Sequence, residues 1–182
     1  MSLACGVSFV VGTRSGGCVS AVRIGHVRNM ARSVLRRYKI AAPPVDVDMI
    51  ARSEGLEVRL IQTWPASVSG LLLRESRLLG LNGLHSRNRR RFSLAHELGH
   101  WFLRHDFPWH ENEISVDDPP EPPGGDSNPI EGEADEFAGE LLAPREMLKR
   151  ALRETGDPRK LAELFEISEE AMWVRLLRHK LL

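Results

Sequence analysis

Cysteine is scarce in this chain of 182 residues, which has two, Cys5 and Cys18, and no Cys-x-x-Cys pair. Such a sequence has no disulfide framework, and we therefore expect a protein of the reducing cytoplasm.

Net charge is also absent, because 25 Lys and Arg balance 25 Asp and Glu. This balance argues against a protein that binds nucleic acid through bulk charge. No hydrophobic run approaches the ~20 apolar residues of a membrane span, so we expect a soluble protein.

The zero net charge is the sum of two oppositely charged segments. Residues 1–45 carry seven Arg and Lys and no acid, whereas residues 105–144 carry twelve acids and no Lys or Arg. We interpret residues 1–25 as a poorly ordered basic extension and residues 26–182 as a single domain. Within that domain we expect an acidic loop rich in Pro and Gly over residues 106–129 and a pair of helices over residues 157–182.

Periodicity and helix caps predict an α+β fold that is mostly helical. An amphipathic helix is expected over residues 27–38. Two apolar runs, 68–74 and 78–82, are typical of a hairpin and predict a small antiparallel sheet before a long helix. Ser86 is expected to cap that helix, Asn128 the one after the acidic loop, and Ser168 the last helix.

The long helix contains the sequence His96-Glu97-Leu98-Gly99-His100. Two imidazoles four residues apart on a helix can reach one metal ion, and this spacing suits zinc. Glu97 would then lie beside a metal-bound water as the general base. The pattern also arises by chance on exposed helices. Apolar residues on nearly every side of this helix predict instead that it is buried, where its polar groups need partners.

The helix that follows the acidic loop offers a third ligand. Measured around the helix from its apolar stripe, Glu131 is the best-aimed carboxylate, whereas Glu136 and Glu140 are expected to point to solvent. Asp135 lies one turn beyond Glu131 and is placed to accept the second ring N–H of a ligand histidine. The alternative role for Glu131 is a capping box with Asn128.

Two segments, Arg91–His100 and Glu131–Pro144, resemble the ImmA/IrrE family of zinc metallopeptidases. The resemblance covers roughly residues 26–182 and includes the hairpin and the C-terminal tail. It implies site-specific cleavage of a helix-turn-helix transcriptional repressor or antitoxin-like partner in the bacterial cytoplasm. It also implies one zinc ion at His96, His100 and Glu131, with Glu97 as the general base. The basic extension and the long acidic insert depart from the family pattern.

The group that would stabilise the oxyanion of a peptidase is not identified by the sequence. The candidates are His85, His105, His110 and Tyr38, each more readily explained as a surface or packing residue. The arginines between residues 87 and 91 are interpreted as a solvated face that could also pair with the acidic insert. The helix-turn-helix pattern of residues 161–180 is interpreted as a packing unit, because acids open its second helix.

Three functions therefore stay open. The first is a zinc endopeptidase that acts on a regulatory protein, and the second is a zinc-containing regulator that binds DNA or a partner with little proteolysis. The third is a zinc hydrolase with a different amide substrate. Glu97 favours an enzyme, because a purely structural zinc site needs no base. We expect a protein substrate, no direct nucleic-acid binding and no membrane association.

Overall fold

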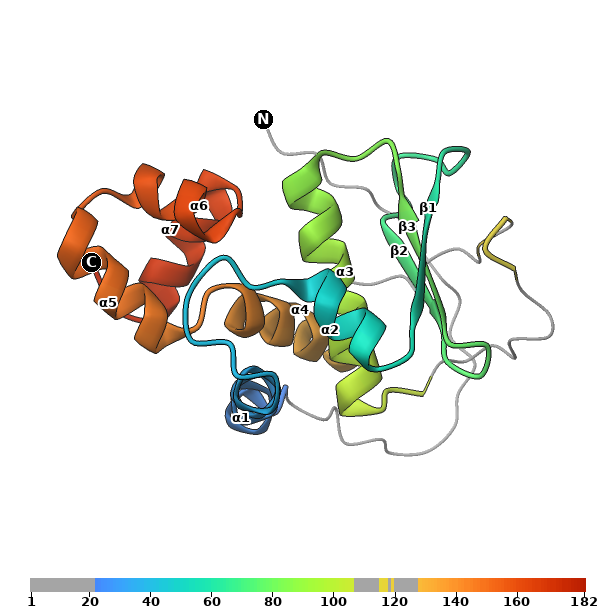
Figure 1. The fold of residues 1–182 in the computed structure, drawn as a ribbon, viewed down its shortest axis with the longest axis horizontal. Helices are drawn as coiled ribbons and strands as arrows, with labels where there is room; N and C mark the ends of the chain where they lie inside the picture. Colours follow the sequence, from blue (N-terminus) through green and yellow to red (C-terminus); the bar gives the residue numbers. More distant parts are fainter. Residues whose placement is uncertain (1–21, 107–114, 118, 120–127) are drawn as a thin grey trace, which may run out of the picture.

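The structure, a computed structural model, describes residues 22–106, 115–117, 119 and 128–182. In these residues seven helices lie to one side of a single sheet of three strands, which confirms the predicted α+β class (Figure 1). The elements in chain order are α1 (Ile24–Arg37), α2 (Val47–Ser53), β1 (Glu57–Ile61), β2 (Gly70–Leu73), β3 (Leu78–Asn82), α3 (Arg87–Leu103), α4 (Pro129–Leu142), α5 (Arg145–Thr155), α6 (Pro158–Phe165) and α7 (Glu169–Arg178).

The sheet has the strand order β1-β3-β2 and is mixed. Strands β2 and β3 form the expected antiparallel hairpin, with Leu73 opposite Leu78. Strand β1 runs parallel to β3, with Glu57 opposite Leu78, so the predicted small antiparallel sheet is confirmed for the hairpin and is wrong for this pair of strands. β3 is largely buried, as expected of the central strand. Its Gly80 leaves room for the Trp64 ring, which packs against it. A Cβ at residue 80 would lie 2.7 Å from that ring.

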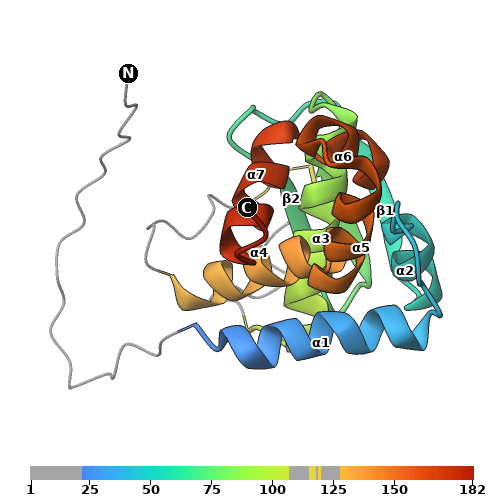
Figure 2. The same ribbon diagram turned by 90° about the vertical axis from the view of Figure 1, so that its left-hand side faces the viewer.

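Helix α3 lies between the sheet and α4 and forms the centre of the main core (Figures 1 and 2). Its apolar side chains Leu94 and Leu98 are buried, as is Phe137 of α4. The two helices approach closely at Gly99, where a Cβ would lie 3.1 Å from Ala134 Cα. This close approach brings the polar residues of α3 and α4 within reach of one another.

Helix α1 packs along α4 (Figure 2), and ion pairs join the two helices. Arg28 Nε lies 2.7 Å from Glu136 Oε1, and Arg32 Nε lies 2.8 Å from Glu140 Oε1. Glu136 and Glu140 are 3% and 0% exposed, so the expectation that they point to solvent is wrong. That expectation assumed a single buried stripe, whereas α4 is covered by α1 and α7 as well as α3. Arg175 of α7 also bonds both carboxylates, which compensates their burial.

The segment boundaries drawn from charge and composition fall partly outside the described residues. Residues 1–21 lie outside them, and the boundary after residue 25 falls inside α1, which begins at Ile24. Most of the expected acidic loop, 106–129, also lies outside them. In its described part, the Val116 carbonyl accepts a hydrogen bond of 2.6 Å from Trp64 Nε1. Val116 thereby joins a small second core cluster on the sheet.

The helix caps expected from the sequence are confirmed. Ser86, Asn128 and Ser168 each accept a hydrogen bond from a backbone N–H in the first turn of the helix that follows. Helices α6 and α7 pack on each other through buried residues that include Phe165 and Met172. Across the described parts of the chain, every helix is too short or too polar to cross a membrane.

Candidate metal centre

His96 and His100 lie one turn apart on α3 and turn their rings toward the same side of the helix. Their Nε2 atoms are 3.0 Å apart, and their ring centroids are 4.7 Å apart. His100 is 2% exposed. The position of both rings follows from the burial of α3, because its apolar residues anchor the helix against the sheet and α4.

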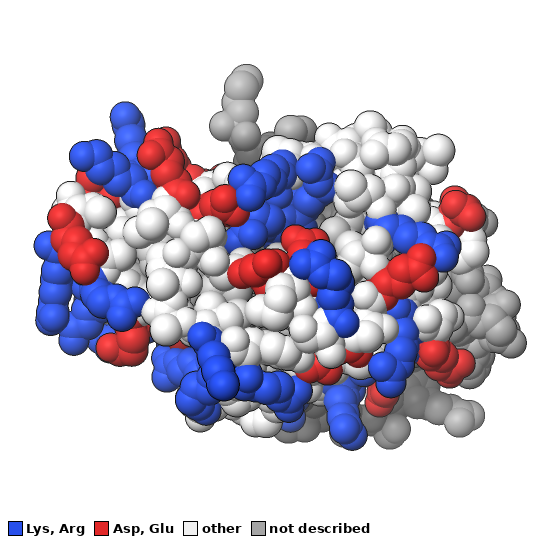
Figure 3. Space-filling view, viewed as in Figure 1, with Lys and Arg blue, Asp and Glu red and all other residues white. Residues whose placement is uncertain are grey.

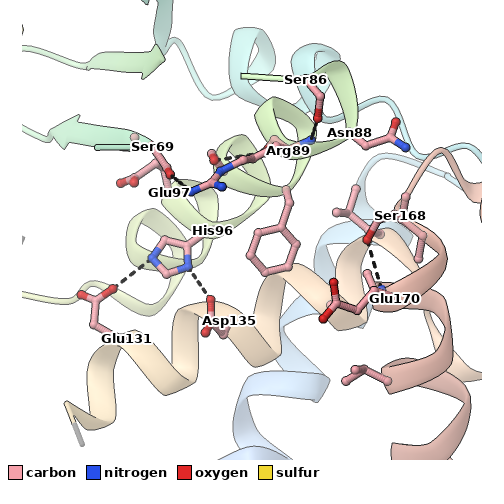
Figure 4. A pocket seen from close by; sticks show the side chains of 18 of the residues that line it. Ser69, Ser86, Asn88, Arg89, His96, Glu97, Glu131, Asp135, Ser168 and Glu170 are labelled. Atoms are coloured by element: carbon pink, nitrogen blue, oxygen red, sulfur yellow. Dashed lines mark hydrogen bonds and ion pairs between the residues drawn. The ribbon is translucent and has the colours of Figure 1, made fainter. Parts of the chain in front are cut away.

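Glu131 reaches these imidazoles from the first turn of α4 (Figure 4). Its Oε2 lies 3.1 Å from His96 Nε2, and its Oε1 lies 3.6 Å from His100 Nε2. The carboxylate therefore faces the two histidines. Asn128 caps α4 by accepting a hydrogen bond from the backbone of Ile130.

The three side chains offer donor atoms that all lie within 4.8 Å of one another. Tetrahedral zinc ligands lie ~2.0–2.1 Å from the ion and hence about 3.3 Å from one another. The separations of 3.0, 3.1 and 3.6 Å are close to that spacing. Two imidazole nitrogens and a carboxylate oxygen are also donors that zinc accepts. In chemistry and in spacing, the set fits a zinc ion.

Asp135 lies one turn beyond Glu131, on the other side of the His96 ring. Its Oδ1 is 2.9 Å from His96 Nδ1, which is the contact expected from the sequence. Burial lowers the pKa of His96, but the hydrogen bonds to Asp135 and Glu131 outweigh it and raise that pKa to about 10. Burial also raises the pKa of Glu131, but the neighbouring His100 and His96 side chains outweigh burial and hold that pKa well below the usual range. The contact between His96 and Glu131 thus favours a positively charged imidazole beside a negatively charged carboxylate.

Glu97 points from α3 toward strand β2 and is 7% exposed. It lies against Gly70, where a Cβ would come within 2.6 Å of Glu97 Oε1. Burial raises the pKa of Glu97 to about 7, although the neighbouring charge of His96 acts in the opposite direction. A carboxylate with a pKa near neutrality can both accept and return a proton.

A cleft of about 830 Å³ opens beside these residues, a volume in the range of ligand-binding clefts. Its walls come from β2, α3, α4 and α7, and Figure 4 shows Ser69 and Arg89 on the side of Glu97. Arg89 Nη2 donates to Ser69 Oγ at 3.1 Å. His96, Glu97, His100, Glu131 and Asp135 all line this cleft.

The residues considered as oxyanion stabilisers do not line this cleft where the structure describes them. His85 contacts the backbone carbonyl of Ala66. The Tyr38 hydroxyl donates to the carboxylate of Glu54, the residue that ends α2. His105 is buried behind His100. His110 lies outside the described residues. Arg89 lines the cleft and was not singled out by sequence reasoning, because it stands in a run of arginines.

A chain of polar contacts leads from His100 away from the cleft. His100 Nδ1 lies 2.9 Å from His105 Nδ1, and His105 Nε2 lies 3.3 Å from Glu133 Oε2. Arg23 donates to Glu133 from Nε at 2.9 Å, from Nη2 at 2.8 Å and from its backbone N–H at 3.0 Å. The hydrogen bond from Arg23 lowers the pKa of Glu133 to about 2. Sequence reasoning gave Glu133 no role, since its partners lie on two other segments.

The arginines at the start of α3 contact the protein itself. Arg87 and Arg91 pair with Glu166 at 2.9 and 3.3 Å, and Arg90 donates to the carbonyls of Gly83 and His85. Figure 3 shows basic side chains beside the start of α3 and around the position of α1, with acidic side chains among them. This face is therefore of mixed charge.

Comparison with known proteins yields a family and a fold. The family described as Peptidase_M78, IrrE N-terminal-like domain, matches residues 51–177. A solved structure named Mycobacterium tuberculosis transcriptional regulator matches with a TM-score of 0.58 and 16% identity, over 84% of this chain and 46% of that chain. The chain thus spans about half the length of that protein, and the likeness shows a shared fold. No curated protein matches significantly.

Proposed function

Because the chain belongs to the Peptidase_M78 family of IrrE N-terminal-like domains, we propose that it is a zinc-dependent endopeptidase. In this proposal His96, His100 and Glu131 bind one zinc ion, and Glu97 is the general base. The observation that supports it best is the convergence of three donor atoms from α3 and α4 at the spacing of zinc ligands.

The chemistry divides between the ion and the chain. When bound, zinc polarises a carbonyl and lowers the pKa of a water. The Glu97 carboxylate accepts a proton from the attacking water and returns it to the leaving amine. Asp135 accepts a hydrogen bond from His96 Nδ1, which leaves Nε2 of that ring for the metal. Arg89, on the Glu97 side of the cleft, is our candidate donor to a substrate carbonyl.

The cleft suits an extended peptide. Strand β2 forms one edge of the described sheet and lines the cleft next to Glu97. An extended peptide can add to the edge of a sheet through backbone hydrogen bonds, with side chains seated in flanking pockets. We infer that the substrate lies along β2 with its scissile bond beside Glu97.

We further propose that the substrate is a regulatory protein, such as a helix-turn-helix repressor or antitoxin-like partner in the bacterial cytoplasm. Cleavage of such a partner would make the chain a regulator of transcription, for example in a stress response. The sequence resemblance supports this substrate class. The alternative is a zinc-containing regulator that binds DNA or a partner with little proteolysis. The burial of Glu97 beside the three donor atoms favours hydrolysis, because a structural zinc site needs no base.

The direct test combines metal analysis with a cleavage assay on helix-turn-helix repressors of the same organism. The purified protein should retain about one equivalent of zinc after remetallation. Glu97→Gln should keep that zinc and lower cleavage by about 10²- to 10⁴-fold. Glu170→Gln changes a carboxylate elsewhere on the cleft wall and is the matched control, with little expected effect.

Two results would overturn the proposal. A remetallated protein that holds no zinc would remove the metal site. A protein that holds zinc, cleaves no such partner and binds duplex DNA with salt-sensitive affinity would support the regulator instead, because phosphate contacts make affinity depend on salt. Fluorescence anisotropy at low and high salt measures that dependence.

A further inference from the structure

His105 lies against His100 because of the way α3 ends. Arg104 adopts the left-handed conformation, with φ 56° and ψ 46°, and ends the helix. The chain then turns back, and the backbone N–H of His105 donates to the carbonyl of His100 at 3.2 Å. This turn brings the two Nδ1 atoms to 2.9 Å, on the side of His100 that faces away from the cleft.

The directions of the hydrogen bonds follow from the partners. Glu133 is 3% exposed, and its carboxylate is only an acceptor, so the facing Nε2 of His105 carries a hydrogen. Two facing Nδ1 atoms need one N–H and one lone pair, because two hydrogens would collide. A neutral His105 with hydrogen on Nε2 accepts at Nδ1, so His100 donates from Nδ1. His100 Nε2 then presents a lone pair to the cluster with His96 and Glu131.

Arg23 completes the chain of contacts. It holds Glu133 through two side-chain N–H groups and its own backbone N–H, and it supplies the counter-charge of this buried carboxylate. Glu133 therefore needs no second cation and is held in the orientation that accepts from His105. Arg23 immediately precedes α1, so these contacts connect the beginning of the first helix to the candidate metal centre.

We propose that His105 and Glu133 are positioning residues that hold His100 in the tautomer whose Nε2 binds metal, with Arg23 orienting Glu133. The metal-binding part of this inference rests on the proposed function. The tautomer does not, since it is a property of the metal-free chain. Partners of this kind typically contribute a factor of 10 to 100 in metal affinity.

The main test compares His105→Leu with His105→Gln. Leucine removes the acceptor for His100 Nδ1–H, whereas glutamine keeps an oxygen that accepts and an N–H that donates to Glu133. Nitrogen chemical shifts of the metal-free protein should show His100 with hydrogen on Nδ1 in the wild type, and a mixture of tautomers in His105→Leu. In chelator competition, the zinc affinity of His105→Leu should fall about 10- to 100-fold, and His105→Gln should recover much of this loss.

Arg23 and Arg28 provide a matched pair of controls. Each forms an ion pair with a carboxylate of α4, but only the carboxylate paired with Arg23 contacts His105. We expect Arg23→Gln to weaken zinc binding several-fold and to shift the His100 tautomer, and Arg28→Gln to change neither. The Arg23 side chain is 56% exposed, so Arg23→Gln carries the test if His105→Leu fails to fold.

The failures of the two proposals are distinguishable. If the wild type binds zinc but folded His105→Leu shows the same His100 tautomer and the same affinity, the positioning inference is overturned and the proposed function stands. The positioning inference is also overturned if Arg23→Gln and Arg28→Gln weaken zinc binding equally. If the wild type binds no zinc, the proposed function fails, and the tautomer in the metal-free protein still decides the inference.

Discussion

The backbone of Gly70 lies against the carboxylate of Glu97, so that a Cβ at residue 70 would be 2.6 Å from Glu97 Oε1. Real Cβ contacts are not this short, and the carboxylate is the part that can move. Strand β2 thus helps to position the proposed general base, and a side chain larger than that of glycine at residue 70 would displace the Glu97 carboxylate.

Gly70→Ala should therefore displace Glu97 without removing any of the proposed metal ligands. A shift of about 1 Å in a catalytic group can cost about 10²-fold in rate, and we expect a fall of that order in kcat/KM. The zinc content should stay at that of the wild type. Gly25→Ala is the control, because nothing lies within 4 Å of a Cβ at that position. Equal rates for Gly70→Ala and the wild type would contradict this role of Gly70.

Asp135 should strengthen metal binding through His96. Asp135→Ala removes the acceptor for His96 Nδ1–H, so the ring loses its fixed orientation, and zinc affinity should fall about 10- to 100-fold. Glu170→Ala removes another carboxylate from the same cleft and should leave the affinity unchanged. Competition with a chromogenic chelator measures both variants. A loss of equal size in both would point to a general effect of cleft charge.

Local relationships made much of the candidate site predictable from the sequence. His96 and His100 share a face because they are four residues apart on one helix. Asp135 and Glu131 share a flank of α4 for the same reason, and the apolar stripe of α4 gave its approximate orientation toward α3. The structure brings these four side chains together as the spacing indicated.

Long-range relationships could not be predicted in this way. Glu136 and Glu140 are buried because arginines 108 positions away in the sequence lie against them. His105 contacts His100 because Arg104 adopts the left-handed backbone conformation. Arginine rarely adopts that conformation, so the sequence does not predict it. The parallel pairing of β1 depends on which strand of the hairpin it joins. The alternation of apolar and polar residues within β1 does not predict which strand that is.

The buried carboxylate of Glu140 should make stability depend on acidic pH. Burial raises its pKa, but His179, Arg175 and Arg32 outweigh burial and lower it to about 2, from 4.5 in the unfolded chain. The folded state therefore binds the proton less readily. The stabilisation is fully present above pH 4.5 and is lost as the pH falls toward 2. Its size should be about 3 kcal/mol.

Glu140→Gln tests this source of acid sensitivity. Urea unfolding at pH 7 should show a loss of about 3 to 5 kcal/mol, because Arg32 loses its ion pair with Glu140 and the buried Arg175 keeps an ion pair only with Glu136. Between pH 5 and pH 3 the free energy of unfolding of the variant should change less than that of the wild type. The same pH dependence in both proteins would assign the effect to other carboxylates.

Gly99 should set the distance between the two helices that carry the candidate metal ligands. A Cβ at this position would lie 3.1 Å from Ala134 Cα, 3.2 Å from Ala134 O and 3.2 Å from Phe137 Cβ. Two of these atoms belong to the α4 backbone, which cannot rotate away as a side chain would. Gly99→Ala should therefore push α4 away from α3 by a few tenths of an ångström.

Two opposing contributions decide the effect of Gly99→Ala on stability. Alanine gains about 1 kcal/mol over glycine inside a helix, whereas overpacking a core costs about 1–3 kcal/mol. We expect a net loss of about 1 kcal/mol in urea unfolding, together with weaker zinc binding because Glu131 retreats from His96 and His100. Gly25→Ala, which is not crowded, should show no loss of either. A Gly99→Ala protein that is more stable than the wild type and binds zinc equally well would show that α4 adjusts without cost.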